Sequence, residues 1–181
     1  VYAGLGNLQK AIEYHEKAVA VARAMGDKIV ESRTYINLGV DCYGLGDFKK
    51  AIEYYKKALE IARAIGDRAG ESACYLGLGV VCCDSKDFKK AIEYHDGALK
   101  ISKTIGDKAR ESACYLGLGN IYFDLGDFRK AIEYYLKAEH IFREMNQFHF
   151  LNNLYKNLSI AYEQIRDYEN AEKYKNPANL R

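Results

Sequence analysis

The sequence contains a single proline and no tryptophan in 181 residues, and no apolar run is long enough to span a bilayer. Because proline interrupts helices, its scarcity favours long helices without kinks. No positively charged segment followed by an apolar stretch opens the chain, so no secretory signal is expected. The net charge is only +2, and lysines alternate with glutamates, which argues against nucleic-acid and membrane partners.

Cysteine is present in an odd number. Several cysteines occupy equivalent positions of a repeat, and stacked helices would place such positions about 10 Å apart. This separation exceeds the reach of a disulfide bond. We therefore interpret the cysteines as small buried thiols of a reducing, cytoplasmic compartment, with a redox or metal role as the alternative; they are Cys42, Cys74, Cys82, Cys83 and Cys114.

One stretch recurs along the chain with a period of forty residues. Gly46–Tyr55 reads GDFKKAIEYY, and close copies include Asp87–His95 and Gly126–Tyr135. A weaker copy covers Asn7–His15 and a degenerate one covers Asp167–Lys175. A fixed period of this length is typical of a stacked repeat array.

Each period is predicted to contain two helices, as residues 67–106 illustrate. Asp67 is suited to cap a first helix whose apolar residues recur every three to four positions as far as Cys83. Asp87 is suited to cap a second helix, which we expect to end near Thr104, before a left-handed Gly106. The expected fold class is therefore all-α.

Glycines at Gly39, Gly79 and Gly119 fall inside the first helices, where each costs about 1 kcal/mol relative to alanine. We expect them to permit close approach of the second helix through its small facing residues Ala51, Ala91 and Ala131. A tyrosine also recurs in each second helix, and we interpret this series as packing rather than as an exposed aromatic strip; it comprises Tyr14, Tyr54, Tyr94, Tyr134 and Tyr174.

A set of residues at fixed spacing carries a family resemblance. In one unit these residues are Tyr75, Leu78, Gly79, Cys82, Ala91, His95 and Ala98, and the units on either side match them. The spacing resembles the tetratricopeptide consensus, whose usual period is about 34 residues. The longer unit is similar to that of Leu-Gly-Asn repeat (Pins-like) scaffolds and kinesin light chains. The resemblance implies a right-handed superhelical solenoid of antiparallel helix pairs, with a concave groove that binds peptides.

The repeat pattern also predicts the domain organisation. We expect a partial first repeat at 1–26 with a complete second helix, full repeats at 27–66, 67–106 and 107–146, and a degenerate capping repeat at 147–181. Val1 aligns with Asp41, so the sequence is expected to start halfway through a first helix of a longer array. Phe148–Phe150 should open an atypical helix, and Pro177 should end the last one. A polar terminal unit would shield the core.

The candidate binding residues are the groove-facing positions that the resemblance assigns to the first helices. In the first full repeat they are Arg33, Ile36, Asn37, Val40 and Tyr43. In the second they are Leu76, Val80, Cys83 and Asp84, and in the third Leu116, Asn120, Phe123 and Asp124. Arg33, Asn37 and Asn120 match residues that grip an extended peptide in the Pins-like scaffolds, whereas Ala73, Gly77, Ala113 and Gly117 stand at polar positions of that pattern.

These residues predict a protein-interaction scaffold that binds an extended or helical peptide segment. Apolar or aromatic side chains of the partner would contact Leu76 and Leu116, and Asn120 would hold its backbone, because a carboxamide both donates and accepts. Asp84 and Asp124 would favour a basic residue. The alternative is that superhelical crowding buries the apolar positions.

Other functions are less well supported by the sequence. No motif indicates a metal site, nucleotide loop or activated nucleophile, so we expect neither an enzyme nor a cofactor. His15 and His95 replace tyrosines of sister repeats and are interpreted as packing variants rather than ligands. The chain could instead be the sensor segment of a larger signalling protein. It could also form a homodimer through an N-terminal edge where Leu5, Leu8 and Ile12 are poorly covered.

Overall fold

Helices in the middle of the chain begin after the aspartates of the repeat. The carboxylate of Asp67 accepts a hydrogen bond from the Gly70 amide at 2.9 Å, and that of Asp87 accepts one from the Lys90 amide at 3.3 Å. These bonds satisfy amides that the first turn of a helix leaves unpaired. Gly106 follows a second helix with φ of 72°, in the left-handed region. The predicted helix starts and the glycine stop are therefore confirmed here.

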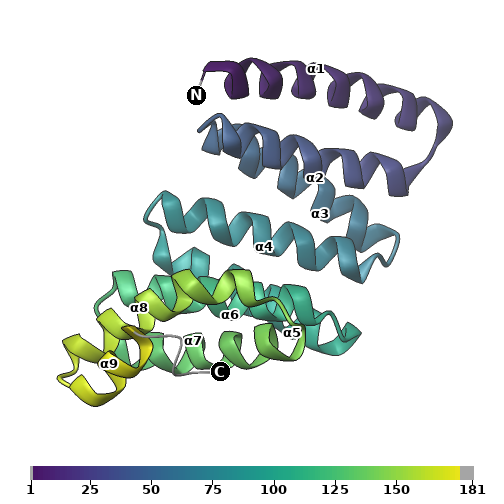
Figure 1. The fold of residues 1–181 in the computed structure, drawn as a ribbon. Coiled ribbons are helices and arrows are strands. Elements are labelled where there is room, and N and C mark those ends of the chain that lie inside the picture. Colours follow the sequence, from purple (N-terminus) through teal and green to yellow (C-terminus); the bar gives the residue numbers. More distant parts are fainter. Residues whose placement is uncertain (1, 176–181) are drawn as a thin grey trace. The chain divides into compact units, whose positions relative to one another are not determined.

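The computed structural model describes the backbone of residues 2–175 and the side chains of residues 7–175, and every regular element in it is a helix (Figure 1). The predicted all-α class, with consecutive helices packed in pairs, is confirmed. Contacts divide the chain into two compact units, unit 1 (residues 1–106) and unit 2 (residues 107–181). Pro177 lies outside the described residues.

Unit 1 contains five helices, each packed against the next in the chain: α1 (Tyr2–Met25), α2 (Lys28–Gly44), α3 (Phe48–Ala64), α4 (Arg68–Asp84) and α5 (Phe88–Ile105). Helix α2 also contacts α4, so two first helices lie side by side (Figure 1). Ala51 and Ala58 on α3 are fully buried beside Leu38 and Leu78. Because alanine has a small side chain, it allows this close packing of helices.

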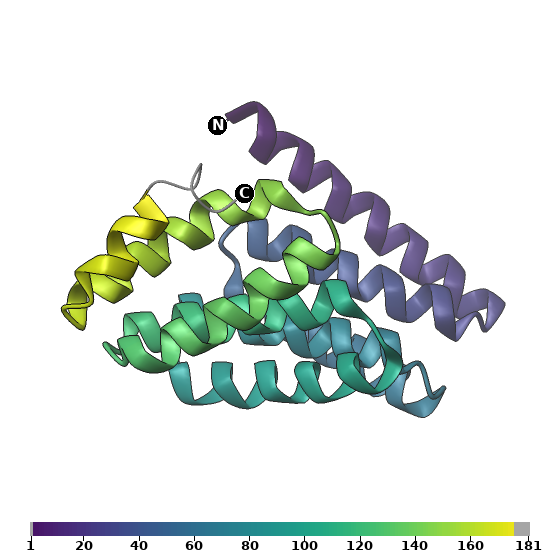
Figure 2. The same cartoon turned by 60° about the horizontal axis from the view of Figure 1, so that its bottom comes forward.

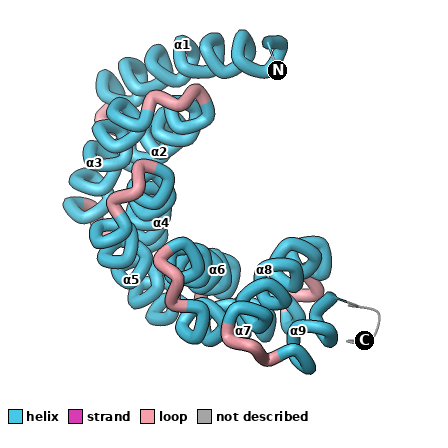
Figure 3. Tube along the Cα trace, turned by 90° about the vertical axis from the view of Figure 1, so that its left-hand side faces the viewer, coloured by secondary structure: helices cyan, strands magenta, loops and turns pink. Residues whose placement is uncertain are grey.

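Unit 2 contains α6 (Lys108–Asp124), α7 (Phe128–Glu144), the short 3₁₀ helix η1 (Phe148–Phe150), α8 (Leu151–Gln164) and α9 (Tyr168–Lys175). Short loops join these helices (Figure 3), and α9 packs beside α8 (Figure 2). Helix α8 has no side-chain cap, because η1 leads directly into it. The expected atypical start of this helix is confirmed.

The first-helix glycines face aromatic rings rather than the alanines that the sequence suggested. A Cβ at Gly39 would lie 2.7 Å from Cε1 of Tyr55, and one at Gly119 would lie 2.5 Å from Cδ1 of Tyr135. At Gly79 the facing ring is that of His95. The expectation of Ala51, Ala91 and Ala131 as the facing groups was therefore wrong. The glycines make room for a ring that reaches across from the second helix.

Helix α1 runs without interruption from Tyr2 to Met25, so residues that align with the end of a first helix belong to it. A Cβ at Gly44 would lie 3.2 Å from Cδ1 of Leu8, and Ile12 packs against the core cluster of unit 1. Both side chains are thus better covered than expected, and the side chain of Leu5 lies outside the described residues. Tyr14, by contrast, is exposed on α1.

The other four tyrosines of the series are packed, as predicted, and the structure adds that each packs against another tyrosine ring. Tyr54 lies on Tyr35 with ring centroids 5.9 Å apart, and Tyr174 lies on Tyr155 at 5.4 Å. The pairs formed by Tyr94 and Tyr134 are similar. The packing interpretation is therefore confirmed for all but Tyr14.

A glutamate–serine pair near the start of α2, α4 and α6 is a structural feature that the sequence reasoning missed. Glu31 is buried, and its carboxylate accepts hydrogen bonds of 2.7 Å from both Arg23 and Lys28. These cations lower the pKa of Glu31, with Lys28 as the larger cause. The neighbouring Ser32 donates to the carbonyl of Ala58 at 3.1 Å. Glu-Ser recurs at forty-residue spacing, and this recurrence was the available signal.

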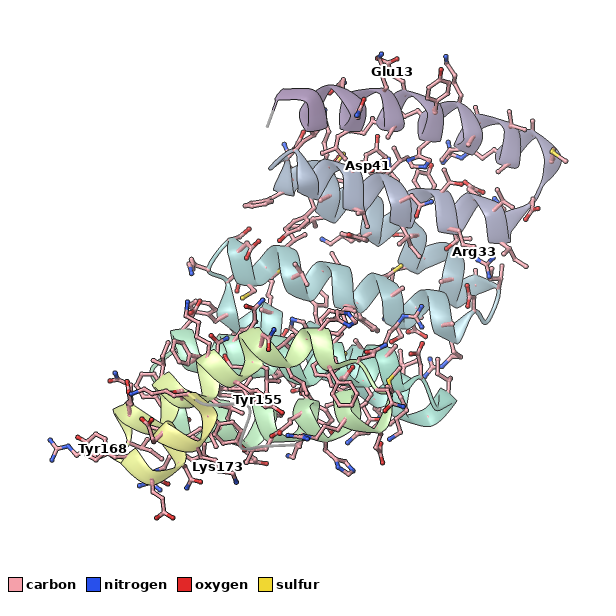
Figure 4. The ribbon with its side chains drawn as sticks, in the orientation of Figure 1. Glu13, Arg33, Asp41, Tyr155, Tyr168 and Lys173 are labelled. Atoms are coloured by element: carbon pink, nitrogen blue, oxygen red, sulfur yellow. The ribbon has the colours of Figure 1, made fainter. Side chains whose placement is uncertain are left out.

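None of the five cysteines forms a disulfide bond, and four of them are buried as predicted. Burial raises the pKa of the Cys74 thiol to about 12, so this thiol stays protonated. Cys83 differs, because it is partly exposed on α4. His15 is a partly buried packing residue whose Nδ1 lies 2.7 Å from Oδ2 of Asp41 on the α1 side of α2 (Figure 4).

Candidate functional site

The predicted residues of unit 1 lie on the neighbouring helices α2 and α4, and together they form one face, called the α2/α4 surface here. Val40 is 53% exposed, and Arg33 and Asn37 are also exposed. Arg33 lies near the start of α2 (Figure 4) and forms no ion pair with any described residue. The remaining residues are exposed or half-buried: Ile36, Tyr43, Leu76, Val80, Cys83 and Asp84. No predicted residue of this surface is buried.

A hydrogen bond links the two helices at one end of the α2/α4 surface. The hydroxyl of Tyr43 on α2 donates to Oδ2 of Asp84 on α4 at 2.6 Å. This bond, with some burial, raises the pKa of Tyr43 to about 12. The ring of Tyr43 also stacks on Phe48 at 5.9 Å. Asp84 therefore helps to hold α2 and α4 together, in addition to placing negative charge at this edge.

The predicted residues of unit 2 lie on α6, beside α8. Leu116 and Phe123 are half-buried, and Asn120 and Asp124 are exposed. The ring of Phe123 meets that of Phe128 edge to face at 5.4 Å. This second face, called the α6/α8 surface here, contains Asn157 of α8 as well.

Three polar side chains form a network on the α6/α8 surface. The hydroxyl of Tyr135 on α7 donates to Oδ1 of Asn120 at 2.8 Å. Nδ2 of Asn157 lies 3.4 Å from Oδ1 of Asn120 and 3.4 Å from the Tyr135 hydroxyl. The oxygen of Asn120 thus already has internal donors, which sharpens its predicted role: the NH₂ group would be the part that contacts a partner.

Asn157 was absent from the predicted site. The sequence nevertheless carried a signal for it, because Asn157 stands three forty-residue periods after Asn37. Of the four predicted residues of α6, Asn120 is the one bonded to Asn157, whereas the nine predicted residues of unit 1 lie on the contacting helices α2 and α4.

The chemistry available on these surfaces is that of binding. Among the described residues, no cluster of three or more His, Cys, Asp or Glu side chains could hold a metal ion. Burial lowers the pKa of His95 to about 4, so the ring is neutral near pH 7. Its Nδ1 is buried and has no hydrogen-bond partner in the described part of the chain. Between residues 2 and 175, no helix is both long and apolar enough to cross a bilayer.

Helix pairs repeated at a fixed period, with accessible side chains on their first helices, define the class of helical repeat proteins. A family model for the tetratricopeptide repeat matches residues 1–64 and 71–144, which is more than half of the chain. The chain belongs to the tetratricopeptide repeat family.

Several solved structures share this fold. BtubC (BKLC) from P. vanneervenii has a TM-score of 0.88 at 22% identity, over 97% of this chain and 73% of that one. A signal transduction ATPase with a tetratricopeptide repeat sensor from Pyrococcus horikoshii has a TM-score of 0.85 at 28% identity, over 99% of this chain. Aspartyl phosphate phosphatase F from Bacillus subtilis has a TM-score of 0.85 at 17% identity, over 98% of this chain. The chain spans only 28% of that ATPase and 49% of that phosphatase. No curated protein sequence matches the chain.

Proposed function

We propose that this chain is a protein-interaction module with two peptide-binding faces, the α2/α4 surface of unit 1 and the α6/α8 surface of unit 2. Tetratricopeptide repeats generally mediate protein–protein interactions. The observation that carries the proposal is the accessibility of the first-helix side chains, since none of the thirteen predicted residues is buried. Accessible apolar side chains that share one face are typical of interaction sites.

The α2/α4 and α6/α8 surfaces favour a partner peptide that carries both apolar and charged side chains. Val40, Leu76 and Leu116 offer apolar contact to aliphatic or aromatic side chains. Asp84 and Asp124 would attract a basic residue of the partner, and Arg33 would attract an acidic one. These charges would orient the segment and the apolar contacts would supply most of the affinity.

A peptide-display selection on the folded chain tests this proposal. Leu76→Asp and Leu116→Asp, introduced together, should abolish enrichment, because aspartate would have to lose its hydration against an apolar partner. Val40→Asp is a milder variant at a more exposed position. Leu136→Asp is the matched control, since Leu136 is an exposed leucine on α7. Circular dichroism should show that all variants remain helical. Equal binding by the double variant and the control would refute the proposal.

A second candidate is a sensor segment of a larger signalling protein. It is favoured by the 28% identity to a signal transduction ATPase whose tetratricopeptide repeats are described as a sensor. Sequencing of the full gene product would test it. An ATPase or other signalling domain in the same polypeptide would support this function, and an independently encoded repeat protein would contradict it.

A third candidate, self-association, is favoured by exposed apolar side chains on α1. Tyr14, Val21 and Met25 are all exposed there. If α1 forms a homodimer contact, light scattering should give a concentration-dependent mass that Val21→Asp reduces to that of the monomer. A constant monomer mass would exclude it.

We also propose the repeat boundaries and the location of the protein. The units would be 27–66, 67–106 and 107–146, with 147–181 as the cap, and the forty-residue unit would be of the Pins-like or kinesin light chain type. The reduced state of five thiols supports a cytoplasmic location. Hydrogen exchange that slows toward the middle repeats would support these units, because terminal repeats have one neighbour fewer.

A further inference from the structure

Tyr55 in unit 1 and Tyr135 in unit 2 stand eighty residues apart, at the same position of the repeat. Both rings lie against a first-helix glycine, Gly39 for Tyr55 and Gly119 for Tyr135. Both side chains are almost completely buried, with 4% of Tyr55 and 0% of Tyr135 exposed. The two hydroxyl groups should therefore need the same kind of partner.

The partners of Tyr135 are two carboxamides. Asn120 accepts the hydroxyl proton at 2.8 Å, and Nδ2 of Asn157 lies 3.4 Å from the hydroxyl oxygen. The hydroxyl is thus satisfied both as a donor and as an acceptor. One carboxamide comes from the first helix before Tyr135, and the other from the first helix after it.

The equivalent positions around Tyr55 carry no polar side chain. They are Val40 on α2 and Gly77 on α4, each eighty residues before its asparagine counterpart. The Tyr55 hydroxyl makes no hydrogen bond to any described residue, although the side chain is almost fully buried. Among the described residues, only Nδ1 of His95 is a fully buried side-chain nitrogen or oxygen without a partner, so the Tyr55 hydroxyl oxygen is accessible to solvent. A ligand group that bonds this hydroxyl would replace a water molecule there and gain affinity.

The Tyr55 hydroxyl lies toward the α2/α4 surface. A Cβ at Gly77 would lie only 2.5 Å from Cζ, the ring atom that bears the hydroxyl. Gly77 is half-buried and Val40 is 53% exposed, so the backbone and side chain that flank the hydroxyl are accessible. Burial raises the pKa of Tyr55 to about 12, so the hydroxyl keeps its proton near pH 7 and can donate.

We propose that the Tyr55 hydroxyl is a hydrogen-bond subsite of the α2/α4 surface that binds the side-chain carboxamide of an asparagine or glutamine in the partner peptide. The partner would thereby provide to Tyr55 the group that Asn120 and Asn157 provide to Tyr135. A carboxamide fits better than a carboxylate, because it can donate as well as accept and because the carboxylate of Asp41, which raises the pKa of Tyr55, would repel a negative charge. This inference rests on the proposed peptide-binding function.

The first step of the test selects peptides from a random twelve-residue library displayed on phage, with the folded chain as bait. A motif that contains asparagine or glutamine at a constant position is expected. A motif without either residue would overturn the inference and leave the proposed function standing. Failure to enrich any peptide would overturn both.

The second step measures the affinity of one selected peptide, and of its asparagine-to-leucine or glutamine-to-leucine analogue, for three chains. Tyr55→Phe should weaken the carboxamide peptide about tenfold and leave the leucine analogue unchanged, because one hydrogen bond is lost. Tyr174→Phe is the matched control, because it removes the same atom from a tyrosine of α9 whose hydroxyl is bonded internally to Glu139, and it should change neither affinity.

Two outcomes of the second step would overturn the inference. One is equal affinity of the carboxamide peptide for the wild-type chain and Tyr55→Phe. The other is an equal loss for the leucine analogue, which would assign the hydroxyl to the peptide backbone instead. Val40→Asn provides a second variant, since its carboxamide should reach Tyr55 as Asn120 reaches Tyr135. It should lower the preference for asparagine or glutamine; an unchanged preference would also count against the inference.

Discussion

Tyr55 in unit 1 and Tyr135 in unit 2 come from nearly identical stretches, GDFKKAIEYY and GDFRKAIEYY, yet their hydroxyl groups have different surroundings. Around Tyr135, Asn120 and Asn157 complete a network within the protein. Around Tyr55, the corresponding residues are Val40 and Gly77, and no described residue bonds the hydroxyl. The repeat therefore conserves the buried ring and varies the accessible residues that meet it.

This difference distinguishes residues that pack the helices together from residues that are available to bind a partner. A buried ring against a first-helix glycine is present in the helix pairs α2/α3, α4/α5 and α6/α7, and so in both units. The polar residues above the ring determine whether its hydroxyl is satisfied within the chain or remains available to a partner. The Tyr135 hydroxyl of unit 2 is hydrogen-bonded within the protein, and the Tyr55 hydroxyl of unit 1 is not.

The largest change in folding stability is expected from the titration of His95, which occupies in unit 1 the repeat position of Tyr135 in unit 2. The pKa of its ring is lowered from 6.5 to about 4 by burial. In the unfolded chain the imidazole of His95 becomes protonated below pH 6.5, whereas in the folded chain it stays neutral until about pH 4. Folding stability should therefore fall as the pH decreases from 6.5 to 4, by about 3 kcal/mol.

Urea denaturation of the wild-type chain and of His95→Tyr between pH 7 and pH 4 would measure this effect. Tyrosine is the residue of the sister repeats and does not titrate in this range, so the difference between the two chains isolates the imidazole. If the free energies of unfolding of the two chains changed in parallel with pH, the His95 ring would not be shielded from protons.

A somewhat smaller loss of stability is expected when the glycine that faces a buried ring, a feature of both units, is replaced by alanine. Gly119→Ala should destabilise the protein by about 2 kcal/mol, because the new methyl group would lie 2.5 Å from Cδ1 of the buried Tyr135 ring. Gly39→Ala should act in the same way through Tyr55. Gly97→Ala is the control, since its methyl group would stand 3.5 Å from Tyr75 and should instead stabilise α5 by up to about 1 kcal/mol. Similar unfolding free energies for all three variants would contradict the interpretation that Gly39 and Gly119 leave room for a buried aromatic ring.

Asn120→Val would make unit 2 resemble unit 1. It removes the acceptor of the Tyr135 hydroxyl and should cost about 1.5 kcal/mol in urea denaturation. In a Tyr135→Phe background the same substitution should cost less, because no hydroxyl remains to be satisfied. Additive effects of the two substitutions would indicate that the bond contributes nothing to stability.

The smallest effect is expected for the reverse change. Val40→Asn would give Tyr55 an internal partner and should raise the free energy of unfolding by up to about 1 kcal/mol. Tyr55→Phe should cancel this gain. A gain that persists in the phenylalanine background would come from the exposed α2 position itself and not from the hydroxyl.

The helices were predictable because their signals are local. Asp67 and Asp87 cap the helices that follow them, and Gly106 ends a helix in a left-handed conformation, all within a few residues along the chain. The glycine contacts were not predicted correctly. Gly39 faces Tyr55 rather than Ala51, because the reach of a long side chain across a helix pair depends on the rotamer and on helix separation.

The binding residues were predictable in part. The forty-residue register identified which positions of α2, α4 and α6 share a face, and the structure leaves all of these positions accessible. Asn157 was overlooked, since the atypical terminal unit obscured its equivalence to Asn37. The bond between Tyr43 and Asp84 joins residues more than one repeat apart, and no local pattern predicts it.

The sequence by itself determined the repeat, the helix boundaries and the family, because periodicity and capping depend on residues that are close along the chain. Only the tertiary structure decided which polar groups are satisfied. Tyr55 and Tyr135 are the same residue in the same local sequence, and their hydroxyl groups differ because side chains from two other helices either meet them or leave them open. Hydrogen bonds act over about 3 Å, so their presence follows from packing in space rather than from order along the chain.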